Sequence, residues 1–189
     1  NTMFQTHFGP VQEDASLVYL RPETAQGMFI NYKNILDTMR PQLPFGMAQI
    51  GKVFRNEITP GNFIFRTREF EQMEIEYFVD PEDWKKRFDE WKKEMISWLQ
   101  NMGIKNIEAY EVPEKDRAHY SKCSIDFLYE FHFGKDELCG LAYRGDYELK
   151  NHGFENPPHV IEPTFGVERL LLALIAESYH EEDVRGETR

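Results

Sequence analysis

The most regular pattern of apolar and polar positions lies in residues 81–101. Large apolar side chains recur there every three or four residues, which predicts an amphipathic helix. These side chains are Trp84, Phe88, Trp91, Met95 and Trp98. Gly103 is expected to end the helix, and the aromatic stripe is expected to pack into the core rather than bind a ligand.

Proline and glycine positions predict three more helical segments. Residues 23–39 are expected to form a helix that begins just after Pro22 and ends before two further prolines. An apolar run follows Gly166 and predicts a buried helix over residues 166–179. A short helical piece is expected over residues 113–118.

Strand-like segments separated by turn residues alternate with these helices. Residues 45–78 predict an antiparallel hairpin, because Pro60, Gly61 and Asn62 form a strong turn signal. The other strands are expected over residues 17–20, 107–112, 124–133, 137–143 and 159–163, with a turn at residues 134–136. Hairpins with helices between them favour an α+β fold built on an antiparallel sheet.

Composition narrows the class of protein. The 189 residues are 41% hydrophobic and 14% aromatic, enough for one domain with a packed core. No apolar run approaches the roughly 20 residues that span a bilayer. The net charge of −11 argues against a protein that coats nucleic acid, but allows a local basic patch. Cys123 and Cys139 lack a metal-ligand spacing and fit two buried thiols in a reducing cytosol.

Two short blocks in the hairpin carry the chemistry of nucleotide binding. They are Phe54-Arg55-Asn56-Glu57 and Arg66-Thr67-Arg68-Glu69-Phe70. If both are strands, Arg55 and Glu57 share one face, and so do Arg66, Arg68 and Phe70. A guanidinium, a carboxylate and an aromatic ring suit the phosphate, the exocyclic amine and the base of a nucleotide.

A third block lies near the C-terminus and reads Glu162-Pro163-Thr164-Phe165-Gly166-Val167-Glu168-Arg169. Together the three blocks resemble motifs 2 and 3 of class II aminoacyl-tRNA synthetases. Two more blocks are similar to the glycyl-tRNA synthetase family, Arg21-Pro22-Glu23-Thr24-Ala25-Gln26-Gly27 and Phe70-Glu71-Gln72-Met73-Glu74. The resemblance covers nearly the whole chain and implies the class II catalytic fold, an antiparallel sheet flanked by helices.

The resemblance implies a glycine–tRNA ligase. Such an enzyme activates glycine with ATP to glycyl-adenylate and transfers the glycyl group to the 3′ end of tRNA(Gly). Chemistry at phosphate asks for positioning and charge neutralisation, so arginines and Mg²⁺ are expected rather than a Cys or Ser nucleophile.

By resemblance, Arg55 and Arg169 are the catalytic residues and hold the α- and γ-phosphates. Glu57 would accept a hydrogen bond from the adenine amino group, and Phe70 would stack on the ring, with core packing as its alternative role. The implied ATP-binding set is Arg55, Asn56, Glu57, Phe65, Arg66, Thr67, Arg68, Glu69, Phe70, Glu137, Leu138, Gly166, Val167, Glu168 and Arg169.

The terminal phosphates and the metal leave alternatives open. Arg66 is the implied partner of the phosphates, and Arg68 could serve instead. Glu137 is the implied Mg²⁺ ligand, because magnesium prefers carboxylate and phosphate oxygens, although a Glu at a turn edge is often simply solvated.

Choice of amino acid is implied to rest on carboxylates. Glu23, Glu74 and Glu162 match the positions that surround the glycine ammonium, and three acids would repel one another without a small cation between them. The implied glycine-binding set is Glu23, Phe70, Glu71, Gln72, Met73, Glu74, Glu162, Pro163, Thr164, Phe165 and Gly166. Thr164 stands where the family usually has Ser, and its methyl group either narrows or impairs the pocket. No zinc ligand set is apparent.

Two other functions compete with this interpretation. One is a non-catalytic accessory or binding subunit that kept the fold, like the synthetase-like subunit of mitochondrial DNA polymerase. The other is a class II synthetase for another amino acid, such as serine, threonine or proline. The joint presence of Arg55, Glu57, Phe70, Glu137 and Arg169 favours an enzyme, and the three carboxylates favour glycine.

The resemblance also implies partners and organisation. Gly61, at the hairpin tip, would meet the tRNA acceptor end. A cytoplasmic homodimer without a membrane association is expected for the full-length protein. Residues 1–189 are expected to form a single, partial catalytic domain, without the motif 1 region and without the anticodon-binding domain that follows a segment like residues 184–187.

Overall fold

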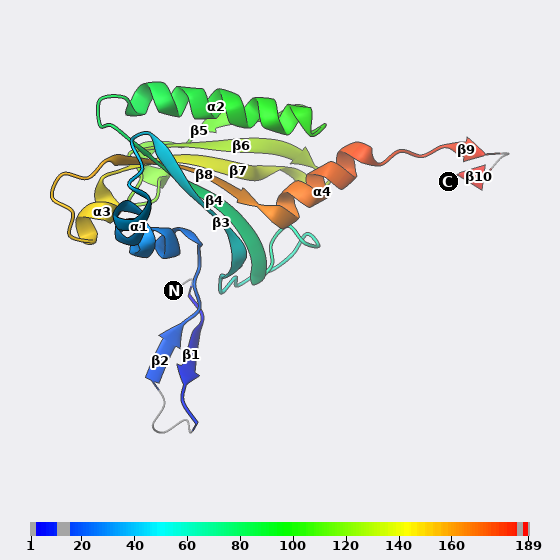
Figure 1. Cartoon of the computed structure of the whole chain (residues 1–189). Coiled ribbons are helices and arrows are strands. Elements are labelled where there is room, and N and C mark those ends of the chain that lie inside the picture. Colours follow the sequence, from blue (N-terminus) through cyan, green and yellow to red (C-terminus); the bar gives the residue numbers. More distant parts are fainter. Residues whose placement is uncertain (1–2, 11–15, 185–186, 189) are drawn as a thin grey trace.

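A six-stranded antiparallel sheet forms the centre of the computed structural model, which describes residues 3–10, 16–184 and 187–188 (Figure 1). The strand order within these residues is β3-β4-β8-β7-β6-β5. The strands are β3 (Phe45–Phe54), β4 (Glu69–Val79), β5 (Glu108–Glu111), β6 (Cys123–Phe131), β7 (Gly134–Gly145) and β8 (His159–Gly166). The predicted α+β fold with an antiparallel sheet is confirmed.

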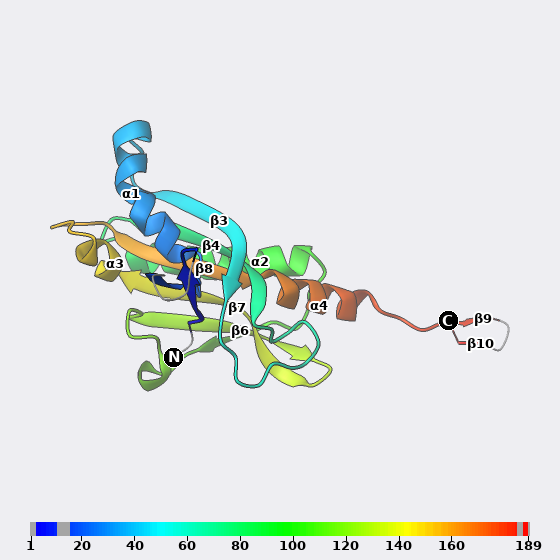
Figure 2. The same cartoon turned by 90° about the horizontal axis from the view of Figure 1, so that it is seen from below.

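Four α-helices flank this sheet within the described residues. They are α1 (Ala25–Met39), α2 (Trp84–Asn101), α3 (Tyr147–Asn151) and α4 (Val167–Ser178). Helix α2 lies along one face of the sheet, α1 and α3 gather at one end, and α4 leaves from the other end (Figures 1 and 2). The 3₁₀ turn η2 (Glu114–Asp116) occupies the predicted short helical piece. Helix α3 was not predicted.

Alternation along β4 sorts its side chains between the two faces of the sheet. Tyr77 faces α2, where its ring meets Trp91 edge to face at 5.4 Å. Trp98 contacts Phe165 of β8 in the same way at 5.0 Å. The prediction that the aromatic stripe of α2 packs into the core is therefore confirmed, and Gln72, Glu74 and Glu76 of β4 are left on the opposite face.

Helix α1 makes a second, smaller core. Phe29 and Tyr32 are buried against Phe78 of β4, Val160 of β8 and Leu149 of α3. The helix begins at Ala25, two residues after the predicted start, and ends at Met39 as predicted. Its packing fixes the segment before it, residues 21–24, over the sheet.

The sequence prediction was wrong about the length of the first hairpin. β3 ends at Phe54 and β4 begins at Glu69, so residues 55–68 form a loop. An isolated bridge between Gly61 and Arg66 closes this loop near the predicted turn. Arg55 and Glu57 therefore do not share a strand face, and neither do Arg66, Arg68 and Phe70.

The second hairpin turns two residues earlier than predicted. β6 pairs with β7 up to Phe131 opposite Gly134, so His132 and Phe133 form the turn rather than residues 134–136. Gly134 opens β7 with a φ of +119°, a conformation that side-chain-bearing residues rarely adopt.

Two small hairpins lie outside the sheet. β1 (Gln5–Phe8) pairs with β2 (Ser16–Tyr19), and their side chains are exposed on an arm that projects from the body (Figure 1). The predicted strand at residues 17–20 is thus confirmed as β2. β9 (Asp183–Val184) and β10 (Glu187–Thr188) follow α4. Arg185 and Gly186, part of the segment expected to precede another domain, lie outside the described residues.

Across the described residues, none of the helices has both the length and the apolar character needed to cross a membrane.

Candidate active site

A cleft of about 310 Å³ opens on the face of the sheet that carries Gln72 and Glu74, the face opposite to α2. β4, β7 and β8 form its floor, and residues 55–70 and 112–126 form its sides. The predicted site residues that line it are Glu23, Arg55, Glu57, Phe65, Arg66, Thr67, Phe70, Gln72, Glu74, Glu137, Leu138, Glu162, Thr164, Gly166, Glu168 and Arg169. Folding thus brings together residues from all of the sequence blocks.

The remaining predicted residues lie outside the cleft lining. They are Asn56, Arg68, Glu69, Glu71, Met73, Pro163, Phe165 and Val167. Strand alternation explains Met73 and Phe165, which belong to the core on the α2 side. Arg68 donates a hydrogen bond from Nε to the backbone carbonyl of Glu57 at 3.0 Å, which braces the loop. This geometry favours Arg66 over Arg68 as the residue that faces a ligand.

Three arginines line the open end of the cleft together with acidic side chains. Arg55 donates from Nε to the carbonyl of Pro22 at 3.0 Å, and its guanidinium lies 5.3 Å from the centre of the Phe70 ring. Arg66 lies 3.8 Å from the Glu57 carboxylate. Arg55 is thus held by the segment that precedes α1, whereas Arg66 is half exposed.

Arg169 enters the open end from α4. It is the third residue of the helix and donates from Nη1 to the carbonyl of Glu137 at 2.8 Å and to its carboxylate at 3.0 Å. Its guanidinium also lies 4.2 Å from the centre of the Phe65 ring. β8 runs directly into α4 at Gly166, without a connecting residue.

The neighbouring Glu168 has a different role. Its two carboxylate oxygens accept hydrogen bonds from the backbone N–H of Glu71 at 2.9 and 3.0 Å, which ties α4 to β4. Arg169 and Glu168 thus anchor the first turn of α4 to strands on both sides of β8.

A second acidic group lies near Glu137. Burial raises the pKa of Asp126 to about 6, and the Glu137 carboxylate adds to this shift. Among the described residues, no three His, Cys, Asp or Glu side chains converge as metal ligands. The Glu137 carboxylate, predicted as a Mg²⁺ ligand, is paired with Nη1 of Arg169 at 3.0 Å.

The closed end of the cleft is acidic and buried. Glu74 accepts hydrogen bonds from the backbone N–H of Thr24 at 2.8 Å and from the Thr24 hydroxyl. Burial raises the pKa of Glu74 to about 7, with a further contribution from Glu162 and a smaller one from Glu23. The three carboxylates predicted to surround an ammonium group thus lie close enough to influence one another.

Arg144 joins these acids and was missed by the sequence analysis. Its side chain is 1% exposed and donates hydrogen bonds to Glu162 and to Glu148 of α3, while Glu23 lies 3.9 Å away. Its guanidinium also stacks on the ring of Tyr120, 3.9 Å from the centroid. The signal that could have indicated Arg144 is its position as a single charged residue directly after the apolar run of residues 138–143.

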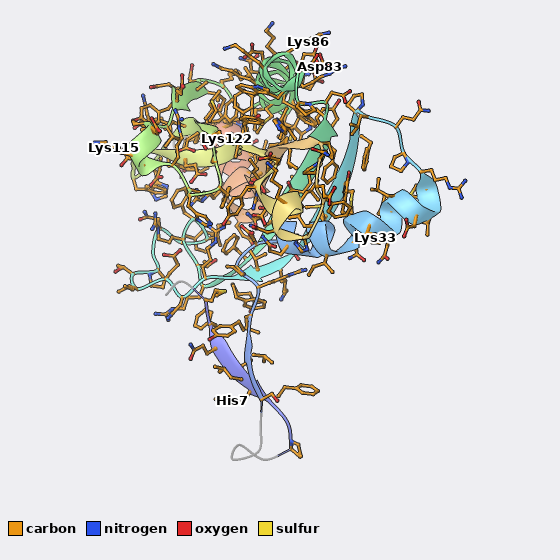
Figure 3. All side chains as sticks on the ribbon, turned by 90° about the vertical axis from the view of Figure 1, so that its left-hand side faces the viewer. His7, Lys33, Asp83, Lys86, Lys115 and Lys122 are labelled. Carbon is orange, nitrogen blue, oxygen red and sulfur yellow. The ribbon has the colours of Figure 1, made fainter. Side chains whose placement is uncertain are left out.

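Carboxylates outnumber this arginine. Glu23, Glu148 and Glu162 surround Arg144. Glu74 lies near Glu162 and Glu23, and Glu76, also missed, is completely buried near Glu162. Lys33, Lys86 and Lys115 lie on the outside of the molecule (Figure 3). The closed end therefore has an excess of negative charge that a small cation can neutralise.

Comparison with known proteins defines the class. Residues 8–179 match the tRNA synthetase class II core domain (G, H, P, S and T). The chain therefore belongs to the class II tRNA synthetase core-domain family. Its fold is also similar to that of Giardia lamblia prolyl-tRNA synthetase in complex with prolyl-adenylate, with a TM-score of 0.74 and 16% identity over 91% of this chain and 36% of that one.

Within this family the chain is similar to proteins named glycine–tRNA ligase. That of Thermus thermophilus is 46% identical over 222 aligned residues, covering all of this chain and 44% of the relative. That of Malacoplasma penetrans is 51% identical over 202 residues, covering 97% of this chain and 44% of the relative. The chain thus spans less than half the length of these relatives.

Proposed function

We propose that this chain is the catalytic core of a glycine–tRNA ligase. It activates glycine with ATP to glycyl-adenylate and releases pyrophosphate, and it then transfers the glycyl group to the 3′ end of tRNA(Gly). The similarity to glycine–tRNA ligases at 46–51% identity supports this function. The proposal covers the activity, the substrates and the partners of the whole protein.

The observation that carries the proposal is the polarity of one cleft. Arginines line its open end, where a nucleotide triphosphate needs cations. Glu23, Glu74 and Glu162 line its closed end, where an ammonium group needs anions. An amino acid bound between them has its ammonium group at the carboxylates and its carboxylate directed toward the arginines and the α-phosphate.

The residues divide the work as follows. Arg55 holds the α-phosphate and stabilises the charge that develops there, while Arg169 holds the γ-phosphate. Phe70, already covered on one side by Arg55, offers its ring to the adenine, and Glu57 accepts from the adenine amine. Glu137 would hold Mg²⁺, which neutralises phosphate charge when bound.

Selection of glycine depends on size and charge together. Thr164 and Gln72 line the cleft close to the carboxylates on the adjacent strands β8 and β4, and would form the wall beyond the Cα of a bound amino acid. A larger side chain must clash with this wall, and steric rejection can exceed the roughly 1–3 kcal/mol that a missing methylene provides.

The test is amino-acid-dependent exchange of pyrophosphate into ATP, measured for all twenty amino acids with Mg²⁺. Exchange with glycine alone supports the proposal. Exchange with serine, threonine or proline instead would keep the class and overturn the assignment of glycine. A folded chain that exchanges with none of the twenty would leave a truncated core or a non-catalytic binding subunit, and the same assay on a longer chain would separate the two.

The assembly and location follow as further proposals. The full-length protein acts as a homodimer in the cytoplasm, and the loop that carries Gly61 meets the acceptor end of tRNA. Sedimentation of the full-length protein tests the dimer. Replacing Gly61 with Asp tests the loop, since added negative charge there should weaken tRNA binding without changing glycine-dependent exchange.

A further inference from the structure

Glu76 occupies an unusual place beside the cleft. It follows Gln72 and Glu74 on the same face of β4, and it is completely buried. It does not line the cleft itself, so it cannot contact a ligand there. A buried carboxyl group behind the wall of a site can act only through the residues it contacts.

The sheet register identifies the residue that Glu76 faces. Glu74 pairs with Thr164 and Tyr77 with Ile161, so Glu76 lies directly opposite Glu162 on β8. Side chains in such cross-strand pairs have Cβ atoms about 4.5–5.5 Å apart. The fully buried Glu76 carboxyl group therefore meets Glu162, which lines the cleft, from the side away from the cleft.

Only one of these two groups accepts a hydrogen bond from a cation. Arg144 donates a hydrogen bond to Glu162, whereas no N–H group of a described residue donates to either oxygen of Glu76. Two adjacent buried carboxylates cannot both ionise without a large cost, so the one without a donor keeps its proton. Burial, reinforced by the Glu162 carboxylate, raises the pKa of Glu76 well above its usual range.

We propose that Glu76 is a positioning residue that remains a neutral carboxylic acid and donates its O–H to the Glu162 carboxylate. Arg144 holds Glu162 from β7 while Glu76 holds it from β4, so the carboxylate stays ionised and is fixed in direction. This inference rests on the proposed function, because it assigns Glu162 to the ammonium of glycine. Specificity for a small ammonium substrate then depends on a residue that never touches it.

Other charged groups around Glu76 are consistent with this assignment. Glu74 on its own strand is an acid and adds to the repulsion, while Arg144 on β7 is already shared by Glu162, Glu148 and Glu23. One proton at Glu76 therefore reduces a local excess of negative charge that the arginine alone does not balance.

Three substitutions of Glu76 distinguish the roles of its charge and its hydrogen bond. In Glu76→Gln the amide can still donate to Glu162, so the KM for glycine in pyrophosphate exchange should stay within about threefold of wild type. Glu76→Leu removes the hydrogen-bond donor. Glu76→Asp keeps the carboxyl group but moves it away from Glu162, because the side chain is one methylene shorter. Both should raise the KM for glycine about 10- to 100-fold, with the KM for ATP changed less than about twofold.

The opposite order would overturn the proposal. If Glu76 acts as a second carboxylate, Glu76→Asp should be milder than Glu76→Gln. If all three variants share the wild-type KM for glycine, Glu76 does not position Glu162. A pH series adds a readout that simple packing does not affect. The KM for glycine should rise in wild type as Glu76 loses its proton at high pH, and Glu76→Gln should lack this rise.

A direct measurement of the proton separates this proposal from the proposed function. In chain labelled with ¹³C at the glutamate side-chain carboxyl carbons, one resonance at pH 8 should have the shift of a protonated acid and should vanish in Glu76→Gln. A resonance of Glu76 in the ionised position would refute the inference even if glycine is activated. A protonated Glu76 in a chain that does not activate glycine would refute the proposed function alone.

Discussion

The two ends of the cleft differ in how far their charged side chains are exposed to solvent. At the open end, charged side chains come from a loop, from the first turn of α4 and from β7 and remain partly exposed, with 47% exposure for Arg66 and 44% for Glu137. At the closed end, Arg144 and Glu162 are 1% and 6% exposed and are joined to further acids by hydrogen bonds. One end can adapt to a ligand, whereas the other is already organised without one.

This difference separates binding from stability. An exposed ion pair contributes about 0–1 kcal/mol, so residues of the open end can be replaced with little effect on folding. A buried ion pair that loses one partner leaves an uncompensated charge, which is costly. Substitutions at the open end should therefore lower activity with little loss of stability, whereas substitutions at the closed end should lower the free energy of unfolding.

The largest effect is expected for Arg144→Met. The substitution leaves Glu162 and Glu148 buried without their cation, so the free energy of unfolding should fall by about 3–5 kcal/mol. Urea denaturation measures this, with Arg66→Ala as the matched control at the open end, where a change within about 0.5 kcal/mol is expected. Equal losses for both variants would show that the two ends do not differ.

A large loss of activity with an unchanged fold is expected for Arg55→Ala. The guanidinium is proposed to stabilise charge at the α-phosphate, and removing such a group costs roughly 10²–10³-fold in rate. Pyrophosphate exchange measures the loss, and urea denaturation should show wild-type stability. Arg68→Ala, next to the cleft but outside its lining, is the control and should retain activity within about tenfold. Similar losses of activity in Arg55→Ala and Arg68→Ala would contradict the specific role proposed for Arg55.

The acidic end should give the chain a pH-dependent stability. The pKa of Glu74 is raised from 4.5 to about 7, so between these values the folded chain binds more protons than the unfolded chain. Stability should therefore decrease as pH rises from about 4.5 to 7 and then level off. The difference in melting temperature between wild type and Glu74→Gln isolates this contribution, and a difference that does not change with pH would contradict it.

The affinity for glycine should have the opposite dependence on pH and increase as pH rises, because the ammonium group of glycine favours the ionised form of Glu74. Affinity for glycine should fall by up to about tenfold for each pH unit below 7. Calorimetric titration measures the affinity and should also detect proton release on binding at pH 6. Uptake of protons would mean that glycine binds elsewhere.

The smallest effect is expected for Thr164→Ser. Losing one methyl group should change the KM for glycine by less than about twofold but lower discrimination against alanine by about 3- to 10-fold. Exchange with each amino acid gives the ratio. An improved KM for glycine would instead show that the threonine methyl impairs the pocket.

The open end was easier to predict from the sequence than the closed end. Arg55, Glu57 and Arg169 lie in short blocks that resemble a known family, and the cleft gathers all three. Their local structure was less predictable, since strand alternation was extended into residues 55–57, where the backbone has already left β3. Local patterns indicate the elements, but they do not fix where a strand ends.

The closed end was hidden because its contacts cross several strands. Arg144 meets Glu162 because β7 and β8 pair, and although Glu148 lies only four residues further along the chain, nothing in the sequence states that both carboxylates bind the arginine. Glu76 likewise faces Glu162 only because β4 and β8 pair in one register. Charged residues in apolar runs were the available signal, and their partners required the structure.

The direct passage from β8 into α4 fixes the distance between residues of the strand and residues of the helix. Glu162 and Arg169 stand on one uninterrupted stretch of backbone, in which the strand residues from Glu162 to Gly166 advance about 13 Å. One inserted residue would turn α4 by about 100° or invert the strand face, and either change would misplace one end of the cleft. In the proposed complex, the separation between the amino group of glycine and the terminal phosphate of ATP is therefore set by the number of backbone residues between Glu162 and Arg169.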